Sequence, residues 1–337
     1  MNGLLLAAGL GTRFQPFTEK IPKPVIPLLN IPIAFYNLHL MQQLGLDNLT
    51  INTHHLPDKI KETFHKYSDA INVPLHFSDE KNKILGTGGA IKKARQTLSS
   101  RGTFVVANAD VVNGFSITDA LEVHHQSHAL ATLIVMEHPE AGKKYGAVWV
   151  DDKNQVVHIG KEKPAKECKP FHFVGVHLLE ESIFKYIPAG ACDINYDVYL
   201  KAIAKDEVVM AYEKSGLWFD AGTLQDYLEA TESLLKMLPK LQHQPYFLSL
   251  FRRFWPGYDR RPNIWEGQGC EHLLPLGNQN KILLGRQCLI HSSVKVSGFA
   301  VFGDGCTVDK NAVIENSIIA AGVNVPADAV HTNTLVL

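Results

Sequence analysis

The sequence lacks the features of a membrane, secreted or zinc-stabilised protein. Its 337 residues include five cysteines, at positions 168, 192, 270, 288 and 306, and no two of them form a C-x-x-C pair. No stretch approaches the roughly 20 apolar residues of a membrane helix. The apolar run in MNGLLLAAGLGTR is too short for a signal peptide and is followed at once by Gly, Thr and Arg, so we interpret it as a buried first strand. We therefore expect a soluble, cytoplasmic protein with free thiols.

An excess of charge of one sign is also absent. The 33 Lys and Arg residues are balanced by 34 Asp and Glu residues, for a net charge of −1. This balance argues against nucleic acid or an acidic membrane as a partner, so any phosphate binding must come from local cations. Two nucleotide-binding motifs are missing as well: there is no G-x-x-x-x-G-K-[ST] motif, and Phe14 replaces the third glycine of G-x-G-x-x-G. A P-loop is excluded and a dinucleotide-binding fold is disfavoured.

The first 236 residues alternate short apolar runs with amphipathic stretches, which predicts an α/β domain with a mostly parallel sheet. Ligands of such sheets bind at the carboxyl ends of the strands. The pattern becomes more strand-rich from Thr132, which indicates a mixed extension of the sheet. The expected strands are Leu4–Ala8, Leu49–Thr53, Phe104–Ala107, Thr132–Met136, Ala147–Val150 and Phe171–Leu178. The expected helices are Ala34–Leu44, Pro57–Tyr67, Gly89–Leu98, Ser182–Tyr186, Asn195–Ala204 and Thr223–Leu235.

The remaining residues divide into two segments. Residues 237–280 are rich in aromatics, Arg and Pro without a clean period, and we interpret them as a linker packed between modules. Residues 281–337 place aliphatic side chains at steps near six, with Gly, Asp and Asn between them, which is typical of a parallel β-helix of hexapeptide repeats. The segment is long enough for only a few coils, so we expect a cap that docks on the rest of the chain. The aliphatic positions are Ile290, Val296, Val301, Val308, Val313, Ile319 and Val325.

The segment from Leu6 to Pro24 holds the strongest chemical signal. A strand ends in small residues, Gly9 and Gly11 allow a sharp turn that brings backbone N–H groups close to an anion, and Arg13 and Lys23 follow. The Arg13 guanidinium suits two-point binding of phosphate, and Lys23 supplies a compact positive charge. Gly-x-Gly alone is a weak motif, but Gly-x-Gly-Thr-Arg with a downstream Lys-Pro is specific.

This segment, LAAGLGTRFQPFTEKIPKPVIPL, resembles the signature of the sugar-nucleotide pyrophosphorylase (sugar-1-phosphate nucleotidyltransferase) family. The resemblance continues through Ile84–Ala90, Asn108–Asp110, Tyr145–Ala147, Glu162–Pro164 and Leu217–Thr223. It implies a Rossmann-like, GT-A-like sheet followed by a C-terminal left-handed β-helix. It also implies that the enzyme joins an NTP to a sugar 1-phosphate and releases pyrophosphate.

The resemblance assigns roles to individual residues. Arg13 and Lys23 are the expected catalytic cations, which neutralise the phosphates because the anionic sugar phosphate needs no general base. Asp110 and Asp220 are expected to bind Mg²⁺. The expected nucleotide-binding residues are Ala8, Gly9, Gly11, Thr12, Gly88 and Asn108. The expected sugar-phosphate-binding residues are Gly146, Glu162, Lys163 and Val174.

Several alternatives stay open at the level of sequence. The chain resembles members that transfer guanylyl to mannose 1-phosphate, which we favour because those members commonly carry a β-helix. It also resembles members that transfer uridylyl to glucose, N-acetylglucosamine or N-acetylmuramic acid 1-phosphate; uridylyl and thymidylyl members commonly place Gln or Glu before the second glycine-rich turn, where Glu80 is the candidate. A non-catalytic subunit that senses an NDP-sugar is a further reading. The β-helix is too short for acyltransfer, so we expect it to serve homo-oligomerisation or core capping.

Overall fold

A computed structural model describes residues 1–99, 102–261, 263–272 and 280–337. The chain forms two compact units, and each combines segments that are distant in sequence. The first unit contains residues 1–10 and 34–218, and the second contains residues 11–33 and 219–337. The signature segment is therefore divided: its glycine turn begins in the first unit, and Arg13 and Lys23 belong to the second.

The first unit is built on one mixed sheet with the strand order β10-β9-β11-β6-β1-β4-β5, and β8 joins β11 to β12. Strands β6, β1, β4 and β5 are parallel, whereas β11 runs antiparallel to β6, β8 and β9. The mostly parallel α/β sheet predicted from sequence is confirmed, as is its mixed extension after Thr132. The strands are β1 Asn2–Leu6, β4 Asn48–Thr53, β5 Leu75–Asp79, β6 Phe104–Asn108, β8 Ala131–Met136, β9 Ala147–Val150, β10 Val156–Gly160, β11 Lys169–Leu179 and β12 Val209–Glu213. Two further short strands are β7 Val112–Gly114 and β13 Leu217–Phe219.

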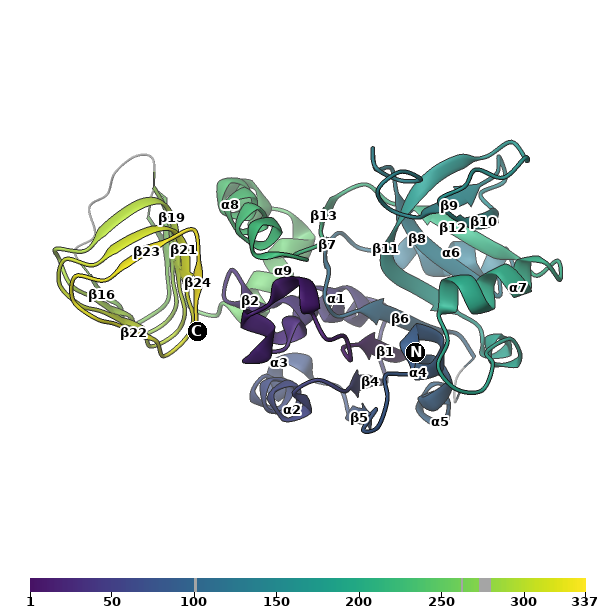
Figure 1. Cartoon of the computed structure of the whole chain (residues 1–337), viewed down its shortest axis with the longest axis horizontal. Helices are drawn as coiled ribbons and strands as arrows, with labels where there is room; N and C mark the ends of the chain where they lie inside the picture. The colour runs from purple at the N-terminus through teal and green to yellow at the C-terminus, as the bar shows by residue number, and fades with distance from the viewer. Residues whose placement is uncertain (100–101, 262, 273–279) are drawn as a thin grey trace. The chain divides into compact units, whose positions relative to one another are not determined.

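Helices connect these strands (Figure 1). The helix α2 illustrates how the sequence specifies them. Pro57 begins this helix, Asp58 favours its first turn, and Ile60 and Phe64 are buried one turn apart on one face. The α-helices are α1 Ile33–Gln42, α2 Pro57–Lys66, α3 Ser68–Ile71, α4 Gly86–Lys93, α5 Arg95–Leu98, α6 Thr118–Gln126 and α7 Leu200–Ile203.

Three predicted helices differ in detail from the structure. The helix predicted at Gly89–Leu98 starts earlier, at Gly86, and is interrupted at Ala94. Residues Glu181–Lys185 form a 3₁₀ helix, η4. Residues Ile194–Tyr199 form a π-helical turn, η5, ahead of α7. The side chain of Asp193 caps η5 by accepting hydrogen bonds from the backbone N–H groups of Asn195 and Tyr196, a tertiary detail that apolar periodicity does not encode.

The carboxyl ends of β1 and β6 lie side by side. Leu6 pairs with Asn108 in the parallel register, and the N–H of Ala109 donates to the carbonyl of Leu6 over 2.9 Å. The loops that begin at Ala7 and Ala109 therefore leave the sheet at the same edge. This is the edge at which ligands of open α/β sheets bind.

The second unit contains the rest of the signature, two long helices and a stack of parallel coils. The helix α8 spans Leu224–Leu241 and α9 spans Pro245–Phe254. Two sheets form the stack, with orders β14-β15-β17-β19-β21-β23 and β16-β18-β20-β22, and β24 also pairs with β21. The coils are drawn in green to yellow in Figure 1. Their strands are β14 Asp259–Arg261, β15 Ile264–Glu266, β16 Glu271–His272, β17 Lys281–Leu284, β18 Leu289–Ile290, β19 Lys295–Phe302, β20 Thr307–Val308, β21 Val313–Ile319, β22 Asn324–Val325, β23 Val330–Thr332 and β24 Leu335–Val336. The signature segment adds η1 Thr12–Phe14, η2 Phe17–Glu19, η3 Lys23–Val25, β2 Pro27–Leu28 and β3 Ile31–Pro32.

Parallel stacking at the C-terminus agrees with the predicted β-helix, and its left-handedness stays a prediction. Six of the seven aliphatic positions expected in its core are buried, and Val313 is half-buried. The parallel pairing reaches back to Ile264, which pairs with Ile282, so a strand within the expected linker contributes to the stack. Other linker residues form the end of α8 and all of α9, whereas residues 262 and 273–279 lie outside the described part of the chain.

The five cysteines are free, as expected. Three of them, Cys270, Cys288 and Cys306, recur at one position of successive coils, since Leu289 pairs with Thr307 and Glu271 with Leu289. The thiol of Cys288 donates to the carbonyl of Gly303 over 3.2 Å, and that of Cys306 donates to Ala320 over 2.9 Å. Among the described residues, no helix has the length and apolarity that a bilayer crossing requires.

A histidine is buried in the core of the first unit. The Nδ1 atom of His177 on β11 lies 2.5 Å from the hydroxyl of Tyr199. Burial lowers the pKa of His177 to about 3, and burial also raises the pKa of Tyr199 well above its ordinary value. Both groups are therefore neutral in the folded protein over the whole physiological range.

We predict that this histidine makes stability depend on pH. The pKa of His177 rises from about 3 to its ordinary 6.5 on unfolding. The neutral histidine therefore contributes fully to the free energy of unfolding above pH 6.5, and this contribution decreases as the pH falls toward 3 because only the unfolded chain takes up the proton. The slope approaches about 1.4 kcal/mol per pH unit for one proton. Urea unfolding at pH 7.5, 6.5 and 5.5 should show a steeper loss for the wild type than for His177→Asn. The exposed His76→Asn is the control, and equal slopes for His177→Asn and the wild type would contradict the prediction.

Candidate active site

The signature loop of the second unit is anchored by Gly11 and Phe14. Gly11 has φ +63°, and a Cβ there would lie 2.8 Å from the Cγ2 atom of Thr18, so the turn requires glycine on both counts. The carbonyl of Gly11 accepts hydrogen bonds from the N–H of Phe14 and the hydroxyl of Thr18. The ring of Phe14 is buried edge-to-face against Tyr227 of α8, with a centroid distance of 5.4 Å. The residue that replaces the third glycine thus holds the loop against a helix.

The same helix places Asp220. The Thr223 side chain accepts from the N–H of Asp226, and the Asp226 carboxylate accepts from the N–H of Thr223, which is a complete capping box at the start of α8. Just before it, the N–H of Gly222 donates to the carbonyl of Asp220 over 2.7 Å. The position of Asp220 is therefore fixed by the beginning of a long helix.

Arg13, Lys23 and Asp220 form an ion cluster. Lys23 Nζ lies 3.2 Å from one carboxylate oxygen of Asp220, and Arg13 Nη2 lies 3.2 Å from the other. The Lys23 side chain is 5% exposed, whereas the Arg13 side chain is 62% exposed. Lys23 is thus held in place, and Arg13 can reorient toward a ligand. The sequence predicted all three residues as site residues, and the structure brings them together.

Gly222 belongs to this cluster, although sequence reasoning assigned it no role. A Cβ at Gly222 would lie 2.5 Å from Nη1 and 2.8 Å from Cζ of Arg13. The guanidinium therefore occupies the space that any other residue would fill. The sequence contains a signal for this glycine, since Gly222 lies two residues after Asp220 in the Asp-Ala-Gly-Thr motif of Leu217–Thr223.

In the first unit, the loop after β1 has open space beside it. Ala8 is buried and Gly9 is exposed, and a Cβ at Gly9 would meet no atom of the described chain within 4 Å. The φ of Gly9 is not in the left-handed region either. No packing or backbone constraint therefore requires glycine here, which favours a close approach of ligand to the backbone.

Glu80 organises the residues around this loop. One carboxylate oxygen accepts from Asn52 Nδ2 and the other from the N–H of Leu85, each over 2.7 Å. Asn52 Oδ1 in turn accepts from the N–H of Ala7 over 2.7 Å. Glu80 is 2% exposed, so its carboxylate ties the turn after β1 to the start of α4. The sequence pattern indicates Glu80 only as a candidate for base recognition, because its contacts with Asn52 and Leu85 arise from the folding of distant segments.

The second glycine-rich turn packs against the segment before η5. Gly86 has φ +69° and a Cβ there would lie 2.5 Å from the carbonyl oxygen of Cys192, and one at Gly88 would lie 2.7 Å from the Cys192 thiol. Thr87 also donates to Asp193 over 3.3 Å. Close packing thus gives Gly88 a structural reason to be glycine, and its predicted contact with the nucleotide stays a prediction.

The segment after β6 places Asn108 and Asp110 at the ligand edge. Asn37 donates to the carbonyl of Asn108 over 2.7 Å. Gly175, with φ +80°, lets β11 pass the Asn108 side chain, which would lie 2.9 Å from a Cβ at Gly175. Asn108 and Asp110 are both half-buried. Val174 is fully buried and its carbonyl accepts from Asn113, so its side chain cannot reach a sugar in this arrangement.

Gly146 borders a cluster of aromatic rings. A Cβ at Gly146 would lie 3.1 Å from the hydroxyl of the exposed Tyr196. The ring of the preceding residue, Tyr145, lies 5.0 Å from that of His172, and His172 lies 4.4 Å from Trp218. Sequence reasoning missed these rings because they come from separate segments of the chain.

Glu162 and Lys163 lie in the connection between β10 and β11. Both side chains are exposed, and neither forms a hydrogen bond or ion pair within the described part of the chain. The neighbouring Lys166, in contrast, pairs with Asp151 over 2.9 Å. Glu162 and Lys163 are thus available to a ligand, but their geometry alone does not indicate a binding site.

The residues of the second unit fit a hard divalent cation in part. The Asp220 carboxylate is oriented by two cations, and carboxylate and phosphate oxygens are the ligands that Mg²⁺ prefers. No group of three or more His, Cys, Asp or Glu side chains able to hold a metal occurs within residues 1–99, 102–261, 263–272 and 280–337. A metal ion here would therefore need ligand oxygens from a substrate in addition to carboxylates of the protein.

Comparison with known proteins agrees with this chemistry. Residues 2–237 match the family model described as nucleotidyl transferase. A UTP–glucose-1-phosphate uridylyltransferase of Synechocystis is 29% identical over 95% of this chain and 82% of its own length. Mannose-1-phosphate guanylyltransferase 1 of Arabidopsis thaliana is 27% identical over 95% of this chain and 86% of its own. The solved structure of HddC from Yersinia pseudotuberculosis superposes with a TM-score of 0.56 at 24% identity, covering 69% of this chain and 99% of that one, which shows a shared fold.

We predict that Asp220 stabilises the second unit mainly through Lys23. Asp220→Ala leaves a buried ammonium without its carboxylate and should lower the free energy of unfolding by about 1–3 kcal/mol. Arg13→Ala should lower it by less than about 0.5 kcal/mol, because the guanidinium is exposed. Urea titration of both variants measures the difference. Asp119→Ala, which removes an exposed carboxylate 3.9 Å from Lys214, is the control, and an equal effect at Asp119 and Asp220 would refute the prediction.

Proposed function

Because the chain belongs to the nucleotidyl transferase family, we propose that it transfers the guanylyl group of GTP to mannose 1-phosphate and releases pyrophosphate. The coarser activity, sugar-1-phosphate nucleotidyl transfer, rests on the family model and on relatives named for it. The observation that supports catalysis is the cluster of Arg13, Lys23 and Asp220. A protein that only sensed an NDP-sugar would have no need to hold two cations on one carboxylate.

The reaction requires charge neutralisation more than proton transfer. The attacking oxygen of a sugar 1-phosphate is anionic near neutral pH, so no general base is needed. The energetic difficulty is to bring two polyanions together and to stabilise the pyrophosphate as it leaves. Fixed cations at the transferred phosphate and mobile cations at the leaving group would meet these needs.

Lys23 and Arg13 fit these two tasks differently. Lys23 is buried and oriented by Asp220, so it would hold the phosphate nearest the attacked phosphorus without reorganising. Arg13 lies at the same 3.2 Å from Asp220 as Lys23, but its side chain is exposed, so its guanidinium can leave the carboxylate at little desolvation cost. Arg13 would therefore exchange the carboxylate for the β- and γ-phosphates and follow the departing pyrophosphate.

We assign Asp110 and Asp220 to Mg²⁺. When bound, Mg²⁺ neutralises phosphate charge and orients the phosphates. On this proposal, Asp220 is shared between the metal and Lys23, whose contact holds the carboxylate in position.

The remaining residues would position the substrates. The backbone at Ala8, Gly9, Gly11 and Thr12 would approach the nucleotide phosphates, with Gly88 and Asn108 near the base and ribose. These roles are proposals from the resemblance, and the open space at Gly9 supports the first of them. For the sugar phosphate we propose Gly146, Glu162, Lys163 and Val174, with Val174 acting through its backbone because its side chain is buried.

The base is the least constrained part of the proposal. Glu80 would be the base reader of a uridylyl or thymidylyl enzyme, but both of its carboxylate oxygens already accept hydrogen bonds from the protein. This observation favours guanylyl transfer. The relatives are named for both reactions, so uridylyl transfer to glucose, N-acetylglucosamine or N-acetylmuramic acid 1-phosphate is the alternative, and a sensing subunit is the second.

The substrates are tested by pyrophosphate release across a grid of NTPs and sugar 1-phosphates, with and without Mg²⁺. We expect the highest kcat/KM for GTP with mannose 1-phosphate and no turnover without the metal. A preference for UTP with one of the other sugars would replace the substrates and keep the reaction class. Silence across the grid, with the protein folded and binding an NDP-sugar, would favour the sensing subunit.

We predict that Arg13 and Gly222 affect turnover together. Arg13→Ala should lower kcat/KM by about 10²–10³-fold. Gly222→Ala should lower it by about tenfold, because the added methyl displaces the guanidinium while the backbone of Gly222 accepts alanine. Neither change should lower the melting temperature noticeably. Lys20→Ala removes an exposed cation of the same segment as a control, and a similar loss of activity there would argue against a specific role for Arg13.

A further inference from the structure

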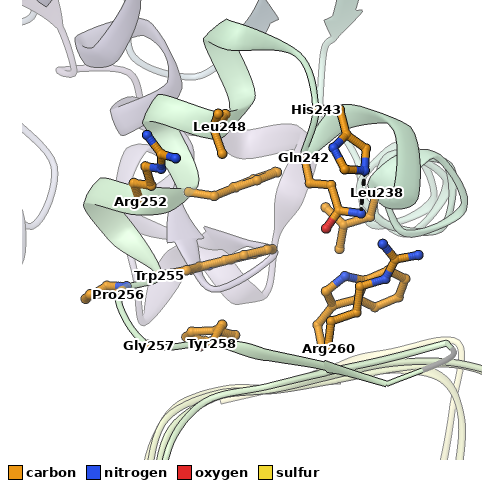
Figure 2. Close-up of a pocket in the computed structure, with 12 residues that line it drawn as sticks. Leu238, Gln242, His243, Leu248, Arg252, Trp255, Pro256, Gly257, Tyr258 and Arg260 are labelled. Carbon is orange, nitrogen blue, oxygen red and sulfur yellow. Dashed lines mark hydrogen bonds between the residues drawn. The ribbon is translucent and has the colours of Figure 1, made fainter.

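A cavity lies within the second unit and contains none of the residues assigned to catalysis. Its volume is about 540 Å³, and its walls come from the C-terminal end of α8, from α9 and from β14 and β15. This volume is in the range of small-molecule sites. Figure 2 shows the cavity with its lining side chains.

One side of the cavity is aromatic. Phe251 stacks on Trp255 with a centroid distance of 4.4 Å and an interplanar angle of 7°, and Trp255 stacks on Tyr258 at 5.2 Å and 19°. The flat rings are visible one above another in Figure 2, below Leu248. Because the rings cover one another's faces, the stack is a rigid apolar wall, suited to the flat or apolar part of a ligand.

A buried hydrogen-bond donor is left unused at this cavity. Trp265 lines it and is 4% exposed. Its indole Nε1 has no hydrogen-bond partner in the described part of the chain. The indole N–H of Trp255, in contrast, donates to the carbonyl of Leu29 over 3.0 Å. Buried donors are nearly always paired in proteins, and a ligand oxygen in this cavity would supply the acceptor that no described residue provides.

Two arginines, Arg260 and Arg252, line the cavity from opposite sides. Gln242 and His243 extend from the end of α8 toward Arg260 on β14, whereas Arg252 lies across the cavity from them (Figure 2). Neither arginine forms an ion pair or side-chain hydrogen bond with another described residue. No Asp or Glu is found among the described residues that line the cavity. As far as the structure describes the chain, the cavity thus offers positive charge without an acidic partner beside an apolar wall.

We propose that this cavity is a second ligand site, for a nucleoside phosphate. The phosphate would lie between Arg260, His243 and Gln242, the base would contact the edge of the aromatic stack, and a ligand oxygen would accept the Trp265 N–H. A guanidinium and an amide donor suit phosphate oxygens, and the apolar wall selects against a bare anion. The site does not depend on the substrates proposed above.

Occupancy of the cavity has a direct route to the ion cluster within the same unit. The indole N–H of Trp255 donates to the carbonyl of Leu29, and Leu29 follows the η3 turn that contains Lys23. The helix α8 lines the cavity at Leu238 and begins three residues after Asp220, at Thr223 as its N-cap. A ligand that orders these contacts would therefore influence the residues that hold the catalytic cations.

The tryptophans of the chain provide the test. Trp149 and Trp218 belong to the first unit, and Trp255 and Trp265 line the cavity. Full-length protein labelled with ¹⁵N-tryptophan gives four indole N–H signals, assigned by Trp→Phe variants. The probes are GMP and UMP, with inorganic phosphate and guanosine representing the charged and the apolar halves alone. The Trp265 signal should shift downfield and saturate with a nucleotide.

Variants distinguish this site from the active site. Arg260→Ala should weaken the Kd read from Trp265 by about tenfold or more, whereas Arg252→Ala, which removes the same charge from the opposite side, should change it by less than about threefold. Arg260→Gln serves if the alanine variant disturbs the signals of Trp149 and Trp218. Arg13→Ala should leave the Trp265 titration unchanged.

Four outcomes would overturn the proposal. The first is a Trp265 signal that does not saturate with GMP or UMP at millimolar concentration. The second is equal weakening by Arg260→Ala and Arg252→Ala. The third is inorganic phosphate or guanosine binding as tightly as the nucleotides, since the site would then not require both halves of the ligand. The fourth is loss of the shift in Arg13→Ala, which would place the nucleotide elsewhere.

Discussion

The contact on which the proposed chemistry depends is the one between Lys23 and Asp220. A buried ammonium is costly to desolvate, and a carboxylate held at a fixed position offsets that cost. The chain fixes both ends independently: Pro22 and Pro24 flank Lys23, and the capping box of α8 follows Asp220. Arg13 then adds a second cation to the same carboxylate without being buried itself. A fixed and a mobile cation, as transfer between two polyanions requires, thus result from one oriented aspartate.

The helix α8 is the physical link between this cluster and the rest of the second unit. Its first turn positions Asp220 and receives the ring of Phe14 on Tyr227, and its last turn lines the aromatic cavity. The hydroxyl of Tyr227 also donates to the carbonyl of Pro27 in the signature segment. A change at the cavity and a change at the cations therefore act on one rigid element, which is the requirement for coupling between two sites.

The sequence predicted those features that local pattern encodes. Apolar periodicity identified β1, β4 and β6 among the parallel strands and most helices, but it missed β5 and β12. The Gly-x-Gly-Thr-Arg and Lys-Pro pattern predicted Arg13 and Lys23 as site residues, and the structure places both against Asp220. Packing between distant segments was not accessible in this way. Glu80 reads as a candidate for base recognition, yet its burial and its contacts with Asn52 and Leu85 make it a structural tie. The buried N–H of Trp265 and the rings around Tyr145 could likewise be found only once the chain was folded.

The glycines show most clearly what structure adds to a motif. The sequence gives Gly9 and Gly88 the same predicted role, since each lies in a glycine-rich turn expected to bind the nucleotide. A Cβ at Gly88 would collide with Cys192, whereas one at Gly9 would meet no described atom. Glycine at position 88 is thus explained by the protein alone, and glycine at position 9 is not. The case at Gly9 has the greater functional weight, because the described residues leave open the space that the proposed contact with a nucleotide phosphate requires.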